Sequence, residues 1–265
     1  FRPLCLSEFR RQPVGMGRDQ LQDALDDGEI DPVEIVRLAV FAPDDARRTW
    51  APHVRQAMDS FHDAVEAMAP FVETHDLPEF CIGGGLGVPY VAGEAAPSIT
   101  EWGTAIQDGC RDAGINARIT AEPGRSIAAA AAVTLYTVGT VKEIPGVRTY
   151  VSVDGGMSDN PRPVLYGSGY ETFLPRAADA ERAKGVRVVG KHCESGDLLV
   201  REGWVPDDLA VGDVLATPVT GAYGHSMGSN YNKILRPAVV FCRDGDARLV
   251  VRRESFDDLV RNDVV

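Results

Sequence analysis

Residues 117–133 have the sequence ARITAEPGRSIAAAAAV, in which a short apolar run meets a Pro-Gly turn and then an alanine-rich segment. This order predicts a strand over 117–121, a turn at 122–125 and a helix over 126–133, because Pro and Gly interrupt regular structure and alanine favours helix. Strand, turn and helix in succession form the repeating unit of a parallel α/β fold. Arg125 falls at the start of the expected helix, where a guanidinium can bind phosphate or carboxylate through two hydrogen bonds.

A second stretch, FCIGGGLGVPY at residues 80–90, repeats the pattern upstream, with a buried strand that ends in a glycine-rich turn. Adjacent glycines let backbone N–H groups approach an anion, and a helix starting beyond them would add its dipole. We therefore expect Gly83, Gly84 and Gly85 at an anion site, although a glycine run taken alone also fits a tight loop. Two such units in a row are typical of the phosphate-binding end of a (β/α)₈ barrel.

The rest of the chain divides into helices followed by strands. Amphipathic spacing predicts helices over Met58–Val72 and Ser98–Ala113, with Ser98 as the N-cap of the second. A terminal helix is expected over Phe256–Arg261. β-Branched runs separated by turns predict strands at Leu135–Val141, Arg148–Val153, Val186–Val189, Asp197–Val200, Val214–Ala216, Ala238–Cys242 and Ala247–Arg252.

The expected fold class is α/β plus all-β, in which the C-terminal strands of a partial (β/α)₈ barrel precede a C-terminal β-domain. The predicted divisions are an N-terminal segment over 1–57, the barrel part over 58–134, and the β-domain with its terminal helix over 135–265.

Composition narrows the class of function. The 265 residues include 27 Lys and Arg against 39 Asp and Glu, a net charge of −12, which disfavours binding to nucleic acid or to an anionic membrane. No apolar run is long enough to span a bilayer, so no membrane partner is expected. The five cysteines are scattered without paired spacing, which favours reduced thiols in the cytoplasm and no metal site.

Two further segments carry chemically active side chains. The stretch GKHCESGD, residues 190–197, sets Cys193 and Glu194 side by side between glycines. Such a turn can donate a proton and bind an ammonium group, or can be a surface turn with an incidental cysteine. The stretch GAYGHSMGSNYN, residues 221–232, offers Tyr223, which either stacks on a planar ligand or packs within its loop.

Five motifs together resemble one known family: GGGLG, EPGR, VSVDGGMSDNPRPVLYG at 151–167, GKHCESGD and GAYGHSMGSNYN. They occur in this order in the diaminopimelate decarboxylases, which belong to the alanine-racemase-like group of pyridoxal-phosphate (PLP) enzymes. The resemblance runs from about Asp59 to Val265. It implies PLP as cofactor and decarboxylation of meso-2,6-diaminopimelate to L-lysine and CO₂ in lysine biosynthesis.

The resemblance also implies roles for individual residues. Cys193 corresponds to the catalytic proton donor, and Glu194 to the residue that binds the distal amino group. Cofactor contacts are implied for Gly83, Gly84, Gly85, Glu122, Pro123, Gly124, Arg125 and Tyr223. Substrate contacts are implied for Arg125, Arg162, Tyr166, Glu194 and Tyr223. In the family the Cys–Glu turn serves the partner subunit's site, which implies a homodimer.

The sequence departs from this family in one respect. The family's Schiff-base lysine lies early in the barrel, whereas the lysines of this chain, Lys142, Lys184, Lys191 and Lys233, all follow the EPGR turn. We therefore expect a C-terminal portion of a decarboxylase or the product of an internal deletion. The alternatives are a lysine-less, non-catalytic relative that binds PLP phosphate or a decarboxylase subunit, a decarboxylase of another basic amino acid, and an anion-binding scaffold unrelated to PLP.

Overall fold

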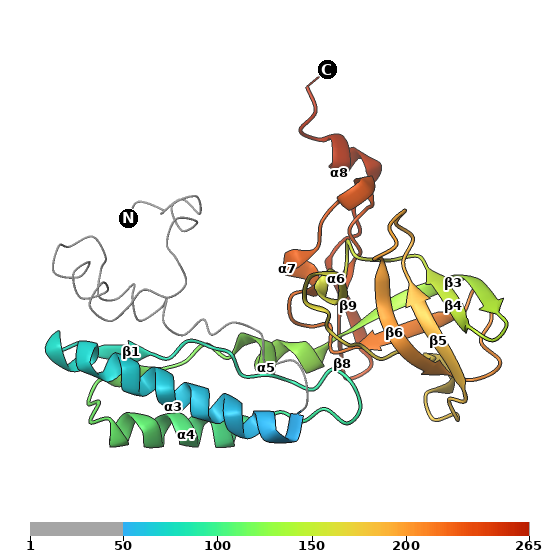
Figure 1. Cartoon of the computed structure of the whole chain (residues 1–265). Helices are drawn as coiled ribbons and strands as arrows, with labels where there is room; N and C mark the ends of the chain where they lie inside the picture. The colour runs from blue at the N-terminus through green and yellow to red at the C-terminus, as the bar shows by residue number, and fades with distance from the viewer. Residues whose placement is uncertain (1–49, 265) are drawn as a thin grey trace. The chain divides into compact units, whose positions relative to one another are not determined.

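The structure is a computed structural model that describes residues 50–264, with side chains described from residue 59 onward (Figure 1). It forms two compact units. Unit 1 comprises the described residues up to Gly85 together with Ser98–Pro123, and unit 2 comprises Leu86–Pro97 and the chain from Gly124 onward. Most of the N-terminal segment predicted over 1–57 lies outside the described residues, and the divisions predicted at 57 and 134 stay predictions.

Unit 1 contains two helices that pack against each other, α3 at Trp50–Thr74 and α4 at Ile99–Asp112. The amphipathic face predicted for the first is confirmed, because Val65 and Met68 are buried. Helix α4 starts where predicted. Ser98 accepts a hydrogen bond from the backbone of Glu101, whose side chain accepts one from the Ser98 backbone, and this reciprocal pair satisfies two donors at the helix start.

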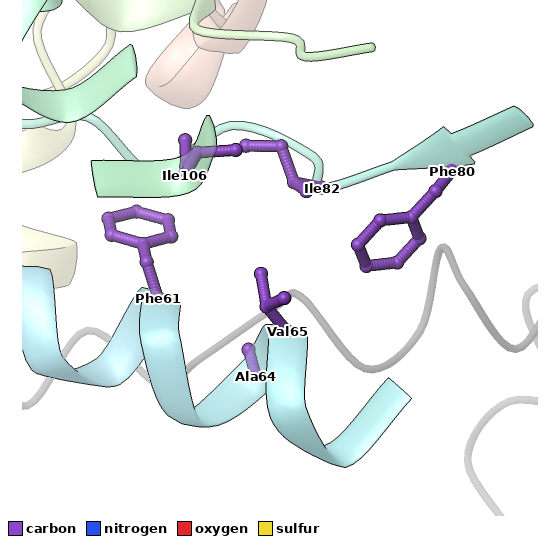
Figure 2. A pocket seen from close by; sticks show the side chains of 6 residues that line it. All are labelled: Phe61, Ala64, Val65, Phe80, Ile82 and Ile106. Atoms are coloured by element: carbon purple, nitrogen blue, oxygen red, sulfur yellow. The ribbon is translucent and has the colours of Figure 1, made fainter. Parts of the chain in front are cut away.

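The core of unit 1 contains a small apolar pocket. Figure 2 shows the side chains that line this pocket, and they come from α3, α4 and the first strand with its following turn: Phe61, Ala64, Val65, Phe80, Ile82 and Ile106. None of these side chains carries a polar atom. The pocket is therefore a gap in core packing and offers a ligand no hydrogen bond.

The strands of unit 1 are β1 at Glu79–Cys81 and β2 at Arg118–Thr120, which pair in parallel with Phe80 opposite Ile119. Parallel neighbours need a crossover, which α4 supplies, so the predicted βαβ order is confirmed. In the described chain no helix directly follows the glycine turn, because the next helix, α4, begins only at Ile99. The intervening stretch is rich in Gly and Pro, which disfavour helix, so no helix dipole acts at this turn.

Unit 2 is built on a five-stranded sheet in the order β6-β5-β4-β3-β7. Its strands are β3 Val133–Ile144, β4 Arg148–Val153, β5 Lys184–Val189, β6 Leu198–Val205 and β7 Val214–Pro218. Strands β4 and β5 are parallel, and the other neighbours are antiparallel. All five strands predicted in this part of the chain are present, and alternate residues such as Val151 and Val188 fill the core.

The helix predicted over 126–133 is wrong in extent. Helix α5 covers Gly124–Ala128, a 3₁₀ turn, η2, covers Ala129–Ala131, and β3 begins at Val133. The reason is tertiary pairing that overrides alanine's helix propensity. The backbone carbonyls of Ala129 and Ala132 accept hydrogen bonds from Gly221 and Thr220, and Val133 pairs with β7.

The C-terminal part of unit 2 contains a hairpin of β8 Val239–Arg243 and β9 Asp246–Val251. The turn residues Asp244 and Gly245 both have positive φ, as a two-residue type I′ turn requires, and the two strands predicted here are confirmed. The remaining elements are short: α6 Arg162–Tyr166, η3 Pro175–Ala177, α7 Gly224–Met227, η4 Tyr231–Lys233 and the predicted terminal helix α8 Phe256–Val260. Within residues 50–264, no helix combines the length and apolarity that a bilayer span requires.

Candidate functional site

The glycine turn and the EPGR turn of unit 1 meet at the carboxyl ends of the two parallel strands. The backbone N–H of Glu122 donates to the carbonyl of Gly83 over 2.7 Å. A side chain at Gly84 would overlap the carbonyl oxygen of Glu122 and would come to 3.9 Å from the Cα of Pro123. Only glycine permits this approach, and Gly85, with φ of +91°, also has a backbone conformation that favours glycine. Ligands of parallel α/β folds bind at this end of the strands.

In unit 2, four of the predicted site residues lie in one cluster around the guanidinium of Arg162. This carbon lies 5.0 Å from the ring centre of Tyr223 and 5.3 Å from that of Tyr166, and Arg125 lies 5.6 Å from the Tyr223 ring. Local structure explains the placement. Arg162 opens α6 after a proline, Tyr166 ends it before a left-handed Gly167, and Gly124 and Arg125 begin α5.

Arg162 is the most distinctive member of this cluster because its side chain is buried, with 4% exposed. Its Nη2 donates to Ser168 Oγ over 3.2 Å, and its Nε has no hydrogen-bond partner within the described chain. No ion pair with an acidic side chain is found for it among residues 59–264. A buried cation without a counter-charge is unfavourable, so this cluster is suited to bind an anion.

Two tyrosines that sequence reasoning missed complete the cluster. Tyr90 lies 5.2 Å from the guanidinium carbon of Arg162, and its ring meets that of Tyr170 edge-on at 5.1 Å. Burial raises the pKa of Tyr170 to about 12, against the opposing effect of Arg162 and Arg125. The Tyr170 phenol is therefore neutral at physiological pH and available as a donor. The position of Tyr90 at the end of the glycine-rich stretch was the one sequence signal for this pair.

The turn between β5 and β6 presents Cys193 and Glu194 on the surface. Cys193 is a free, exposed thiol. Glu194 Oε1 accepts a hydrogen bond of 2.5 Å from the phenol of Tyr231, a residue of the 221–232 motif to which sequence reasoning assigned no role. Tyr223, which is 38% exposed, stands at the N-cap of α7 with φ of +69°.

The buried carboxylate of Asp197 stabilises this turn from the protein interior. Asp197 accepts hydrogen bonds from the backbone N–H groups of Met157, over 2.7 Å, and His192, over 2.8 Å. The buried His192 ring lies 2.9 Å from Ser158 Oγ through Nε2. The His192 ring is thereby bonded inward to the 154–160 loop.

Metal-ligating side chains are not gathered in this part of the molecule. Among the described residues, no three or more His, Cys, Asp or Glu side chains lie where they could hold one ion.

Comparison with known proteins identifies the class. A family model described as pyridoxal-dependent decarboxylase, C-terminal sheet domain, matches residues 27–221. The match covers most of the chain, and the chain therefore belongs to the pyridoxal-dependent decarboxylase family. The partial barrel with a following β-domain is the fold expected for it, and that prediction is confirmed.

The particular relatives are diaminopimelate decarboxylases, so the resemblance indicated by the five motifs is confirmed. The enzyme of Mycobacterium bovis is 48% identical over 202 residues, covering 72% of this chain and 45% of that protein. The solved structure from M. jannaschi has a TM-score of 0.71 at 31% identity, covering 78% of this chain and 49% of the other. A Helicobacter pylori structure complexed with L-lysine has a TM-score of 0.68 at 30% identity, covering 77% and 50%. The chain thus spans about half the length of these relatives.

Proposed function

We propose that this chain serves the PLP-dependent decarboxylation of meso-2,6-diaminopimelate to L-lysine and CO₂, a step of lysine biosynthesis in the cytoplasm. Its relatives are named diaminopimelate decarboxylase, and one of the solved structures is complexed with L-lysine, the expected product. The proposal includes a homodimer in which Cys193 and Glu194 serve the partner subunit's site. The alternative of another basic amino acid has less support, because the lysine/ornithine decarboxylase of Vibrio vulnificus is only 22% identical.

The observation that carries the proposal is the buried Arg162. Its guanidinium donates to Ser168 Oγ and contacts three tyrosine rings, and no acidic side chain among residues 59–264 forms an ion pair with it. A substrate carboxylate would supply the missing charge through two parallel hydrogen bonds, with the Tyr166 hydroxyl as a further donor. Arg125, beside Tyr223, is proposed as a second carboxylate contact, and this pairing of cations suits an amino diacid.

The residues present also fit the cofactor. The unit 1 turn, in which Gly84 must lack a side chain, exposes the backbone of Gly83, Gly84 and Gly85 to a phosphate, and Glu122 and Pro123 line the same turn. In unit 2, Gly124 and Arg125 are proposed as phosphate contacts, and Tyr223 as a contact to cofactor and substrate. When bound, PLP supplies an electron sink for the charge left as carbon dioxide departs.

The protein's own groups then direct the substrate and the proton. The carboxylate of Glu194 accepts the distal ammonium of diaminopimelate and so fixes which end reacts. The Sγ–H of Cys193 delivers a proton to the α-carbon, as a thiol placed beside the reacting carbon can do in general acid catalysis. Arg162 and Tyr166 bind the substrate carboxylate that does not leave as CO₂, and this contact orients the substrate before reaction.

The test compares Arg162→Gln with an exposed control on β6, Arg201→Ala, in calorimetric binding of meso-diaminopimelate. We expect Arg162→Gln to weaken binding by roughly tenfold or more, as for loss of a charged hydrogen bond, and Arg201→Ala to leave it unchanged. Circular dichroism checks that each variant folds. Equal affinity in wild type and Arg162→Gln would remove the anion site and the proposal built on it.

A second measurement addresses the cofactor lysine. The chain is incubated with PLP and reduced with borohydride, and its intact mass and peptides are measured. An adduct at Lys142, Lys184, Lys191 or Lys233 would show that a lysine of this chain binds PLP covalently. Reversible PLP binding without an adduct would restrict these residues to non-covalent contacts, and the absence of any binding would contradict the cofactor proposal.

A further inference from the structure

Glu194 does not extend freely from its turn. Its Oε1 accepts a hydrogen bond of 2.5 Å from the phenol of Tyr231, a residue 37 positions further along the chain. The Tyr231 ring is tilted against that of His192, with 5.5 Å between the ring centres. Tyr231 therefore contacts the turn at two of its residues, one exposed and one buried.

The turn itself is a rigid base for this contact. Its buried end is fixed by Asp197, which receives two backbone hydrogen bonds, and by His192, which is bonded to Ser158. A side chain at Gly190 would overlap the Asp197 carboxylate, so the strand leading into the turn packs directly on this group. With the backbone held in this way, the remaining freedom of Glu194 is in its own side-chain torsions, and Tyr231 restricts those.

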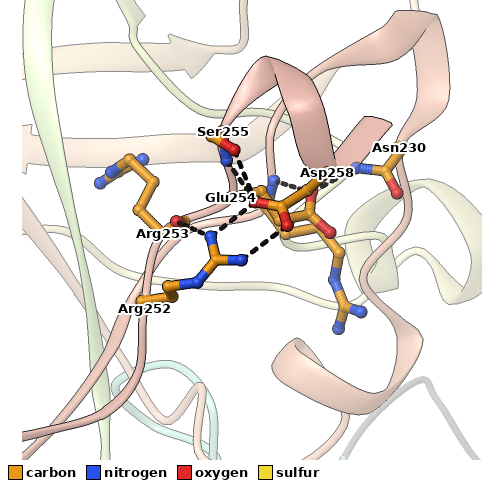
Figure 3. Close-up of polar contacts among 7 residues, drawn as sticks. Asn230, Arg252, Arg253, Glu254, Ser255 and Asp258 are labelled. Carbon is orange, nitrogen blue, oxygen red and sulfur yellow. Dashed lines mark hydrogen bonds and ion pairs between the residues drawn. The ribbon is translucent and has the colours of Figure 1, made fainter. Parts of the chain in front are cut away.

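The segment that carries Tyr231 is anchored in turn by the C-terminal part of the chain. Figure 3 shows Glu254, whose Oε2 accepts hydrogen bonds from Asn230 Nδ2 over 2.6 Å and from the backbone N–H of Arg236 over 2.8 Å. These two contacts bracket the short helix η4. Within it Asn232 and Lys233 have positive φ values of 53° and 57°, a conformation that persists where surrounding contacts hold it.

We propose that Tyr231 is a positioning residue that presents Glu194 to the second ammonium group of the substrate and so determines preference for a diamino acid. This inference rests on the proposed function. A carboxylate has about four lone-pair sites, so one bond from Tyr231 leaves the other oxygen available to an ammonium. The phenol is uncharged and orients Glu194 without neutralising it, whereas a Lys or Arg at this position would compete with the substrate.

The test compares binding of L-lysine with that of L-norleucine, which lacks the distal amino group, by calorimetry on the full chain with PLP. We expect Tyr231→Phe to reduce the preference for lysine about three- to tenfold and to leave norleucine affinity unchanged, since the hydrogen bond is charged but partly exposed. The matched control is Tyr150→Phe on β4, which should keep the wild-type preference.

A second readout is independent of ligand binding. The hydrogen bond to Glu194 raises the pKa of Tyr231, so Glu194→Gln should lower it toward the ordinary tyrosine value in a ¹³C-tyrosine NMR titration. An unchanged titration would mean that the contact does not exist in solution and would overturn the inference. A normal lysine preference in Tyr231→Phe would overturn the inference and leave the proposed function standing. A wild-type chain that does not distinguish lysine from norleucine would refute the proposed function, and the inference with it.

Discussion

Gly156→Ala should weaken the hydrogen bonds to Asp197 that support the Cys193–Glu194 turn. A Cβ at this position would lie 2.7 Å from both Asp197 Oδ2 and His192 Cδ2, closer than real Cβ atoms are found to their neighbours. Relief needs a movement of roughly 0.5–0.7 Å, which would lengthen hydrogen bonds that now measure 2.7 and 2.8 Å to about 3.2–3.5 Å. Overpacking of this kind costs about 1–3 kcal/mol, and a protein of this size loses about 2–4 °C in Tm for each kcal/mol.

The assay is thermal unfolding, combined with amide hydrogen exchange at Met157 and His192, the two donors to Asp197. We expect a fall in Tm of about 4–8 °C for about 2 kcal/mol, with faster exchange at both amides. The control is Gly139→Ala on β3 of the same sheet, where an added Cβ would meet Ser152 at an ordinary 3.7 Å. Equal stability and equal exchange in the two variants would refute the argument that this carboxylate is closely packed.

Three further perturbations test separate parts of the structure. Ser98→Ala removes the N-cap of α4 and should cost about 1 kcal/mol in thermal unfolding, whereas no loss would mean that the cap is not formed in solution. Arg176 lowers the pKa of Asp213 from its ordinary value to about 2, so the pair stabilises the fold above about pH 4 and loses this effect as pH falls toward 2. Asp213→Asn should therefore cost about 1 kcal/mol in urea unfolding at pH 7 and progressively less below pH 4, and a difference independent of pH would contradict this linkage. Iodoacetamide should modify the exposed Cys193 at least about tenfold faster than the buried Cys110, because burial raises the pKa of the Cys110 thiol. Peptide mass mapping would measure both rates, and equal rates would contradict the burial of Cys110.

Local patterns carried most of the fold prediction. Alternating burial along Arg148–Val153 matches the alternation of side chains in the strand, and Ser98 followed by Glu101 is a capping signal within four residues. The alanine run failed because its local preference is for helix, while the contacts that end the helix come from β7 and from Thr220 and Gly221, about ninety residues later.

The candidate site likewise contains residues that local motifs predict and residues whose contacts depend on the tertiary structure. Arg125, Arg162, Cys193 and Glu194 were predicted as site residues because they sit in motifs that resemble a family, and their residue types match a definite chemistry. Tyr231 also lies in one of these motifs, but nothing in the sequence indicates its role, because its contact with Glu194 exists only after a distant loop folds against the turn. A single sequence records which groups a site contains better than it records which groups hold them in place.

The energetics of Arg162 show why such supporting groups matter. Burying a guanidinium without a counter-charge costs several kcal/mol, and three contacts with aromatic faces return about 0.5–2 kcal/mol each. The aromatic neighbours can therefore hold the cation in the interior without satisfying it, since an aromatic face attracts charge but accepts no strong hydrogen bond. A carboxylate arriving at this cluster meets a donor that is already desolvated and oriented, so little reorganisation is needed on binding. The same reasoning applies to Glu194, which one neutral hydrogen bond orients while its charge remains available to a cation.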